Sequence, residues 1–405
     1  MMSKAFTFFQ KYVSFDTTSS ETSGTHPSSA GQLELGNFLV KQLRDFGVAD
    51  AAMSEHGFVM GHLAASPGYE TAPALGLIAH MDTASAASGK EVKLSVVDYC
   101  GGSIELGSSG RASTPGEAFV GHRLAVTDGT TLLGADDKAG IAAIMALLED
   151  LQTRQIPHGK LCICFTPDEE IGEGTMFFDV AGFGAKYAFT VDGGNPAEVE
   201  FQNFNAAGAK IVIRGLSCHP GYAKNLMVNA LKVGMELDAM LPADDVPEKT
   251  EGFQGFFHLL ELKGNVACAE MEYIIRDHDA EKFAARKALL RDVASELNRK
   301  YGDNTVQLEI TDQYRNMEEV VSRFPELLTL ADEAIRRAGL TPAHPPIRGG
   351  TDGAKLSFMG LPCPNLGTGG HFAHGELEFL SLDELEKVVE ILRNLAGLCR
   401  EQGKK

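Results

Sequence analysis

Residues 74–82 read ALGLIAHMD, an apolar run that ends in His80, Met81 and Asp82. An uninterrupted apolar run of this length is typical of a strand inside a sheet that is covered on both faces. In open α/β sheets, ligands bind at the carboxyl ends of the strands. The run therefore predicts an α/β domain with a functional site where this strand ends.

Two more apolar runs end in the same way. The expected strand Leu161–Thr166 leads into Asp168, Glu169 and Glu170, and the expected strand Tyr187–Val191 leads into Asp192. A helix is expected over 136–151, because apolar residues recur on one side of it, and Asp136 and Asp137 lie at its start. A fifth cluster, His374-Gly375-Glu376, lies near the end of the chain. Imidazoles together with carboxylates suit zinc, cobalt or manganese better than calcium or magnesium, so the clusters predict a hydrolytic site with two transition metals.

Composition bounds the class of protein. The chain has 405 residues, 44% of them hydrophobic, which is enough for two domains. Its 55 acidic and 36 basic residues give a formal charge of −19, which would repel nucleic acid and anionic membranes. No apolar run reaches the roughly 18 residues of a membrane span. Seven cysteines without paired spacing predict reduced thiols and a cytoplasmic protein.

The pattern of apolar and polar residues changes in the middle of the chain. Lys210–Arg214 and Met271–Arg276 alternate between apolar and polar residues, as strands with one wet face do. Helices are expected over 228–240 and 280–300, whereas 101–116 is expected to be a glycine- and serine-rich loop. Because His374 follows this middle part and the other clusters precede it, the main domain must be discontinuous. We expect it to comprise 1–204 and 317–405, with a smaller α+β domain, 205–316, inserted.

Eight stretches, spread in order along nearly the whole chain, resemble the peptidase T family of di-zinc tripeptide aminopeptidases. They are His80–Thr83, Thr127–Gly140, Phe165–Glu170, Thr190–Gly194, His219–Gly221, Tyr273–Asp277, Ile347–Gly353 and Leu361–Asn365. The resemblance implies a zinc-peptidase catalytic domain with a mixed sheet flanked by helices, and an inserted lid domain that binds substrate. Glutamate carboxypeptidases, aminoacylases, dipeptidases and succinyl-diaminopimelate desuccinylase share the metal core of this group.

The resemblance also assigns the metal ligands. It implies that His80 and Asp192 bind one zinc ion, that Glu170 and His374 bind the other, and that Asp136 bridges them. A shared carboxylate offsets the repulsion between two ions roughly 3.5–4 Å apart. Family members hold a cis peptide bond after the bridging aspartate. Cobalt or manganese are expected to be able to replace zinc.

Further roles follow from the same likeness. Glu169 is implied as the general base, and Asp82 as the residue that orients the imidazole of a ligand. His219 resembles the histidine that stabilises the tetrahedral oxyanion. Arg276 and Arg348 resemble anchors for the carboxylate of a peptide, a task that suits a planar guanidinium.

These side chains also have plainer structural interpretations. Adjacent acidic pairs are common in so acidic a chain, and a histidine at the end of an apolar strand is often a hydrogen-bonded core residue. His371 competes with His374 as a ligand, and the family pattern favours His374. Glu169 and Glu170 cannot both face a metal from a regular strand, so a bend is expected near Gly172.

Three functions are compatible with these patterns. The preferred one is a cytoplasmic metalloaminopeptidase that removes the N-terminal residue from tripeptides. The second is a related di-zinc amidohydrolase, either a dipeptidase or a deacylase, and the third is a non-catalytic peptide or metal binder. Asp82 and Glu169 argue against the binder, which needs neither. Small peptides are the expected partners, and no binding to nucleic acid or membrane is expected. A homodimer is compatible with the sequence.

Overall fold

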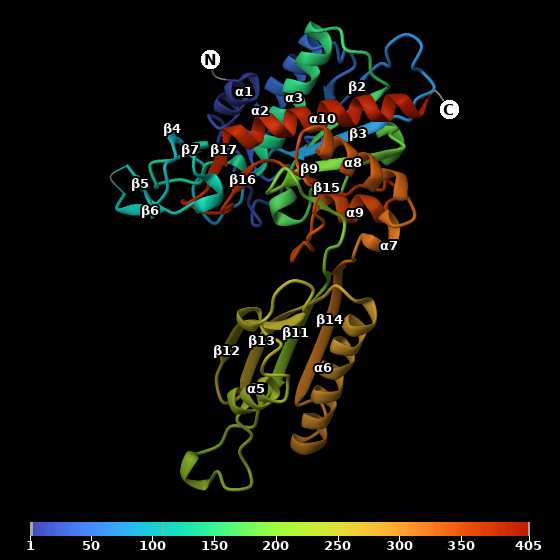
Figure 1. Cartoon of the computed structure of the whole chain (residues 1–405). Helices are drawn as coiled ribbons and strands as arrows, with labels where there is room; N and C mark the ends of the chain where they lie inside the picture. The colour runs from blue at the N-terminus through green and yellow to red at the C-terminus, as the bar shows by residue number, and fades with distance from the viewer. Residues whose placement is uncertain (1–2, 108, 404–405) are drawn as a thin grey trace. The chain divides into compact units, whose positions relative to one another are not determined.

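The computed structural model describes residues 3–107 and 109–403 (Figure 1). The chain forms two compact units. The larger unit contains Met1–Phe201, Glu319–Pro345 and Thr351–Lys405, and the smaller unit contains Gln202–Glu318 and Pro346–Gly350. The α/β character predicted for the chain is confirmed, with a mixed sheet and flanking helices in the larger unit.

A seven-stranded mixed sheet forms the centre of the larger unit, in the order β1-β2-β8-β3-β9-β15-β10. Its strands are β1 (Ala52–Met53), β2 (Val59–Leu63), β3 (Leu75–His80), β8 (Leu161–Thr166), β9 (Tyr187–Gly193), β10 (Val199–Glu200) and β15 (Asn365–Gly367). The strand β3 runs parallel to both β8 and β9, and each of its residues is buried. The interior strand predicted from residues 74–80 is therefore confirmed.

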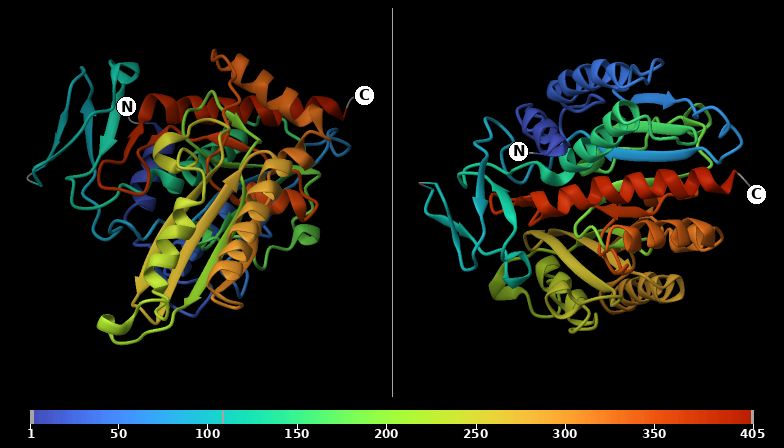
Figure 2. Two further views of the ribbon diagram at one scale, coloured as in Figure 1. Left: turned by 90° about the horizontal axis from the view of Figure 1, so that it is seen from below. Right: turned by 45° about the horizontal axis from the view of Figure 1, so that its top comes forward.

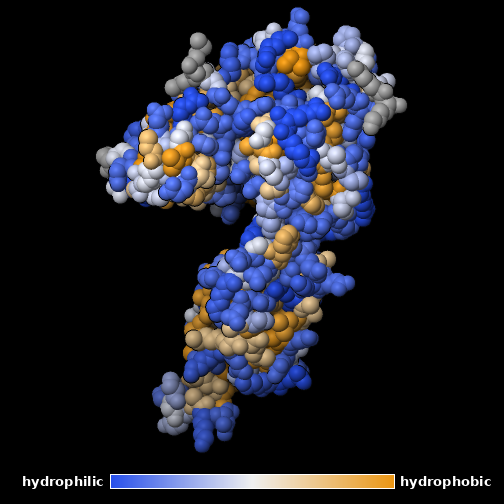
Figure 3. Space-filling model, viewed as in Figure 1, coloured by the Kyte–Doolittle hydropathy of each residue, from blue (hydrophilic) through white to orange (hydrophobic). Residues whose placement is uncertain are grey.

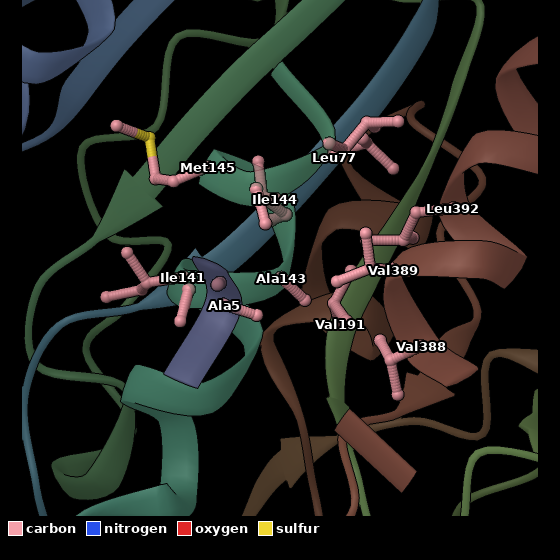
Figure 4. Close-up of a cluster of buried hydrophobic side chains, with 14 of the residues drawn as sticks. Ala5, Leu77, Ile141, Ala143, Ile144, Met145, Val191, Val388, Val389 and Leu392 are labelled. Carbon is pink, nitrogen blue, oxygen red and sulfur yellow. The ribbon is translucent and has the colours of Figure 1, made fainter. Parts of the chain in front are cut away.

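Helices cover both faces of this sheet. The helices of the larger unit are α1 (Lys4–Tyr12), α2 (Ala30–Asp45), α3 (Ala135–Thr153), α4 (Val180–Phe183), α8 (Pro325–Arg337), α9 (Asp352–Phe358) and α10 (Leu382–Gln402), and α7 (Glu318–Val321) begins at the boundary between the units. On one face, Leu77 and Val191 pack with Ile144 of α3 and with α10 (Figure 4). On the other face, Ile78 packs with residues of α4 and α9. Figure 2 shows α8 and α10 side by side.

A smaller four-stranded sheet, β16-β17-β7-β4, also belongs to the larger unit. It is formed by β4 (Ser95–Asp98), β7 (Arg123–Val126), β16 (Gly370–His371) and β17 (Phe379–Ser381), with the 3-10 helix η1 (Glu117–Phe119) nearby in sequence. The loop expected over 101–116 is wrong in part, because β5 (Ile104–Leu106) and β6 (Arg111–Ser113) form a hairpin there. Ile104 and Leu106 bury their side chains against Leu124 and Phe379, and strands of three residues are too short to produce a visible period.

The smaller unit has a four-stranded antiparallel sheet in the order β12-β13-β11-β14. Its strands are β11 (Asn205–Arg214), β12 (Phe256–Gly264), β13 (Cys268–Asp277) and β14 (Val306–Tyr314); its helices are α5 (Ala230–Ala239), α6 (Ala280–Tyr301), η3 (Pro220–Tyr222) and η4 (Pro247–Lys249). Ile211 and Met271 face the core formed with α5 and α6, whereas their neighbours Lys210 and Glu272 do not. The predicted alternation is confirmed. Both long helices begin at a side-chain cap, Asn229 for α5 and Asp279 for α6.

The face drawn in Figure 3 is largely hydrophilic. Among the described residues, no helix combines the length and the apolar character that crossing a bilayer requires.

Candidate metal centre

The predicted clusters meet at one edge of the large sheet. His80 is the last residue of β3 and is level with Thr166 at the end of β8, which precedes Asp168, Glu169 and Glu170. Because Ile78 pairs with Thr190 on the other side, Asp192 of β9 is also level with His80. The parallel order β8-β3-β9 therefore brings these carboxylates and the imidazole together at the carboxyl ends of the strands.

Asp136 lies between two histidines. Its Oδ1 is 2.9 Å from Nε2 of His80, and its Oδ2 is 3.0 Å from Nε2 of His374. Asp192 Oδ1 lies 3.4 Å from the same His80 nitrogen, and Glu170 Oε2 lies 3.1 Å from the same His374 nitrogen. Each oxygen of Asp136 thus faces one histidine that has a second carboxylate beside it. The peptide bond between Asp136 and Asp137 is cis, as the resemblance implies.

The donor set fits two borderline transition metals. Nitrogen and carboxylate ligand atoms of His80, Asp136 and Glu170 all lie within 4.8 Å of one another, and the same is true of His80, Asp137 and Asp192. One oxygen of Glu170 and one of Asp137 are buried without a hydrogen-bond partner among the described residues. A buried carboxylate oxygen without a hydrogen-bond donor is unfavourable unless it binds a cation. These two oxygens without donors therefore favour metal ions at this position.

Electrostatics point to missing positive charge. Burial raises the pKa of Asp192 to about 7, although His80 opposes this shift. Hydrogen bonds to Asp136 and Glu170 raise the pKa of His374 to about 11. Burial lowers the pKa of His80, but the carboxylates of Asp192, Asp136 and Asp82 together raise it well above its ordinary value. Divalent ions would compete with protons for these donor atoms, so metal binding here is expected to release protons.

Asp82 organises the turn that carries the acidic pair. Its fully buried carboxylate accepts hydrogen bonds from the backbone N–H groups of Glu169 at 3.0 Å and Glu170 at 3.1 Å. The nearest acceptor to Nδ1 of His80 is the backbone oxygen of Asp82 at 3.0 Å, and its carboxylate Oδ1 lies at 3.4 Å. Asp82 thus fixes the imidazole of His80 on one side and the acidic pair on the other.

The bend predicted after β8 is confirmed. Glu169 and Glu170 begin a short 3-10 helix, η2 (Glu169–Ile171), between Asp168 with φ 54° and Gly172 with φ 74°. Burial, followed by the charges of Asp192 and Asp352, raises the pKa of Glu169 well above its ordinary value. A carboxyl group with a raised pKa is suited to exchanging protons near neutral pH.

Two buried carboxylates near this centre were missed by sequence reasoning. Glu378 is 2% exposed and accepts hydrogen bonds from the backbone N–H groups of Leu133 at 2.7 Å, Gly134 at 2.8 Å and Asp136 at 3.0 Å. Asp352 is 3% exposed and accepts a hydrogen bond from Thr166 at 2.9 Å. Glu378 lies between Leu377 and Phe379, and nothing in the sequence separates it from an exposed glutamate.

His371 and Glu376, the other two candidate ligands near His374, contact other residues. His371 Nε2 lies 2.7 Å from Oε2 of Glu384, and its ring stacks on Phe379. Glu376, which was part of the predicted cluster, lies 3.2 Å from Arg111. Of His371, His374 and Glu376, it is His374 whose side chain contacts the carboxylate of Asp136.

His219 and Arg276, two of the candidates for substrate binding, belong to the smaller unit. His219 is exposed before η3, and its Nδ1 accepts a hydrogen bond from the backbone N–H of Gly221. Arg276 donates to two backbone carbonyl groups, and its guanidinium lies 5.3 Å from the ring centre of Tyr314. Arg276 thus keeps a planar cation beside an aromatic ring on the sheet.

Arg348, the third candidate, is a brace within the smaller unit. It donates to the backbone oxygens of Gly252 at 2.9 Å and Gln254 at 3.0 Å, and to Oγ1 of Thr250 at 2.9 Å. Its guanidinium also lies over the rings of two phenylalanines, Phe204 and Phe256. These contacts hold the loop 250–254 against the sheet.

Comparison with known proteins identifies relatives of this chain. The model for peptidase family M20/M25/M40 matches residues 121–397. Peptidase T of Shouchella clausii is 46% identical over 402 residues, covering 98% of both chains, and peptidase T of Clostridium perfringens is 47% identical over 408 residues, covering 99% of this chain and 100% of the other.

Solved structures share the fold. The aminopeptidase PepT from Bacillus cereus superposes with a TM-score of 0.79 at 23% identity, covering 99% of this chain and 98% of that one. A tripeptidase from Staphylococcus aureus gives 0.78 at 21% identity, covering 99% and 100%. A dinuclear metal-binding peptidase from Bacillus subtilis gives 0.67 at 16% identity, covering 98% and 97%. The whole chain therefore has counterparts of the same architecture.

Proposed function

This chain belongs to peptidase family M20/M25/M40 and to its peptidase T group, and on that premise we propose that it is a cytoplasmic di-zinc aminopeptidase that releases the N-terminal residue of tripeptides. The observation that carries the proposal is the position of Asp136, with one carboxylate oxygen 2.9 Å from His80 and the other 3.0 Å from His374. Such a carboxylate can serve two ions at once. Two peptidase T relatives at 46–47% identity over nearly the full length support the choice of substrate.

The ligands divide into two sets around Asp136. His80 and Asp192 would hold one ion, and Glu170 and His374 the other, with Asp136 shared. Zinc bound there would supply Lewis acidity and a water whose pKa is lowered to about 7. Cobalt and manganese accept the same donors, and the metal used is set by availability as well as by the ligands.

Glu169 is the proposed general base. Its backbone is fixed by Asp82, so its carboxylate is held beside the ligand Glu170. Burial raises its pKa, which lets it take a proton from water and return it to the amine that leaves. Asp82 acts on this step by positioning, since it touches the backbone of the turn and the imidazole of His80.

The inserted segment 205–316 is proposed to be the lid that binds substrate. Arg276 and Arg348 would pair with the carboxylate of the peptide, and His219 would donate to the developing oxyanion. Arg348 already braces 250–254, whereas Arg276 donates to main-chain oxygens of its own sheet and lies over the ring of Tyr314. Arg276 is therefore the stronger candidate of the two for direct contact with the carboxylate.

One assay separates the proposed function from its alternative. Release of free amino acid is measured with Leu-Gly-Gly and with the matching dipeptide, tetrapeptide and N-acetylated tripeptide, before and after chelation and zinc restoration. The proposal requires cleavage confined to the free tripeptide, lost with chelator and regained with zinc. Cleavage of only the dipeptide or the acetylated compound would instead identify a related dipeptidase or deacylase.

A further inference from the structure

A second histidine–carboxylate cluster lies in the larger unit, outside the ligand set described above. His26 Nδ1 is 3.1 Å from Oδ2 of Asp168 and 3.6 Å from Oε2 of Glu173. Ligand atoms of these three residues all lie within 4.8 Å of one another. None of the three has a role in the proposed mechanism, so the cluster calls for an explanation of its own.

The imidazole of His26 is buried without hydrogen bonds. Its side chain is 10% exposed, and neither ring nitrogen has a hydrogen-bond partner among the described residues. Asp168 Oδ2 is near enough to Nδ1, but a hydrogen bond also requires the oxygen to be aligned with the N–H direction. An imidazole in this position leaves both ring nitrogens without a hydrogen bond, at about 1–3 kcal/mol each, whereas one that binds a metal through Nδ1 leaves only Nε2 unsatisfied.

The spacing of the ligand atoms is that of a shared ion. Zinc binds nitrogen and carboxylate oxygen at about 2.0–2.2 Å, so two ligands in tetrahedral geometry lie roughly 3.4 Å apart. The two distances from His26, 3.1 and 3.6 Å, lie on either side of that value. In such a site the ion occupies the lone-pair direction of the nitrogen, which places the oxygens off that axis.

Asp168 is held ready as a ligand. Its carboxylate is fully buried and accepts hydrogen bonds from the backbone N–H of Ser28 at 2.8 Å, from the Ser28 hydroxyl, and from Nε2 of Gln32 at 2.7 Å. Neighbours of this kind fix the orientation of a metal-binding carboxylate. Glu173 has a side chain that is 41% exposed, which gives an ion a path from solvent and leaves room for water in its coordination.

From this geometry we propose that His26, Asp168 and Glu173 form a third divalent-metal site, selective for zinc, cobalt or manganese. One imidazole and two carboxylates are the donor set that these ions prefer over calcium and magnesium. Because Asp168 immediately precedes Glu169 and Glu170, an ion bound here also stiffens the turn that carries them. The site is defined by metal binding and does not depend on the peptidase activity.

The test is the metal content of the full-length protein at equilibrium with buffered zinc, from nanomolar to high micromolar free concentrations. The expected result is three zinc ions per chain in the wild type and two in His26→Asn and in Glu173→Gln. His56→Asn is the matched control, because His56 stacks on Phe177 beside the cluster without belonging to the ligand set. This control should still bind three ions.

The outcomes separate the third site from the centre around Asp136. In Asp136→Asn the central ions should weaken while the third is retained. The third site is therefore measured by the one-ion difference between the wild type and His26→Asn or Glu173→Gln, whatever the occupancy of the centre around Asp136. Equal zinc counts in the wild type and in both His26→Asn and Glu173→Gln overturn the inference, and so does the loss of the same ion in His56→Asn. If His26→Asn fails to fold, the half-exposed Glu173 provides the same test.

Discussion

Replacing Glu378 by glutamine tests whether the metal centre depends on a carboxylate that touches no metal. Glu378 accepts two backbone N–H groups with Oε2 and the N–H of Asp136 with Oε1. An amide has one accepting oxygen, so the variant can keep the bonds to Leu133 and Gly134 only by turning its own NH₂ toward Asp136. The backbone N–H of Asp136 then loses its acceptor.

For folding, the cost of the weakened hydrogen bonds is nearly offset by no longer burying a charge. For metal binding there is no such offset. An unsatisfied buried N–H costs about 1–3 kcal/mol, and the two remaining bonds weaken by roughly 1 kcal/mol each when the charge is lost. Burial raises the pKa of Glu378 from 4.5 to about 7, so removing the charge returns about 3 kcal/mol. The metal-free variant should thus lose no more than about 2 kcal/mol, while the displaced Asp136 lowers metal affinity by about 10–100-fold.

The measurement is competition for zinc against a chelator, beside thermal unfolding of the metal-free protein. Glu376→Gln is the control, because Glu376 lies two residues earlier in the same loop and pairs with Arg111 at the surface. An unchanged zinc affinity in Glu378→Gln would refute the reasoning. An equal loss of affinity in Glu376→Gln would show that the loop, and not the bond to Asp136, is responsible.

Three more outcomes are expected. Glu169→Gln should retain its metal content by elemental analysis but lose roughly 10³-fold in kcat, and near-normal turnover would remove Glu169 as the base. Arg276→Lys should raise KM for free tripeptides and leave KM for carboxyl-amidated tripeptides unchanged; an equal effect on both would exclude a carboxylate anchor. The metal-free protein should become less stable as pH rises from 4.5 to 8, because burial raises the pKa of both Glu200 and Glu378 to about 7. A carboxyl group whose pKa is higher in the folded than in the unfolded state contributes its full stability below the unfolded pKa. That contribution is lost as pH rises through the folded pKa. Zinc should reverse this trend in thermal unfolding, and stability that rises with pH without metal would contradict it.

The sequence predicted the parts of this molecule in which local pattern and burial coincide. Strands covered on both faces, such as β3, are apolar throughout, and their polar residues must follow where the strands end. The sequence could not predict which exposed-looking acids are buried. Glu378 and the contact between His26 and Asp168 depend on segments that are distant in the chain and adjacent only after folding. The short hairpin at β5 and β6 was missed because its strands contain too few residues to establish a period.

The segment Pro346–Gly350 makes the smaller unit a composite of two pieces of chain. The backbone passes from one unit to the other four times, after residues 201, 318, 345 and 350. Ile347 bonds to Gln202 through its N–H and to His278 through its carbonyl oxygen, and Arg348 holds the loop 250–254. An isolated fragment 202–318 would therefore lack the contacts that Ile347 and Arg348 provide. Transplanting the smaller unit into a relative requires moving both pieces, because an exchange of the long piece alone would pair it with a foreign Pro346–Gly350 segment.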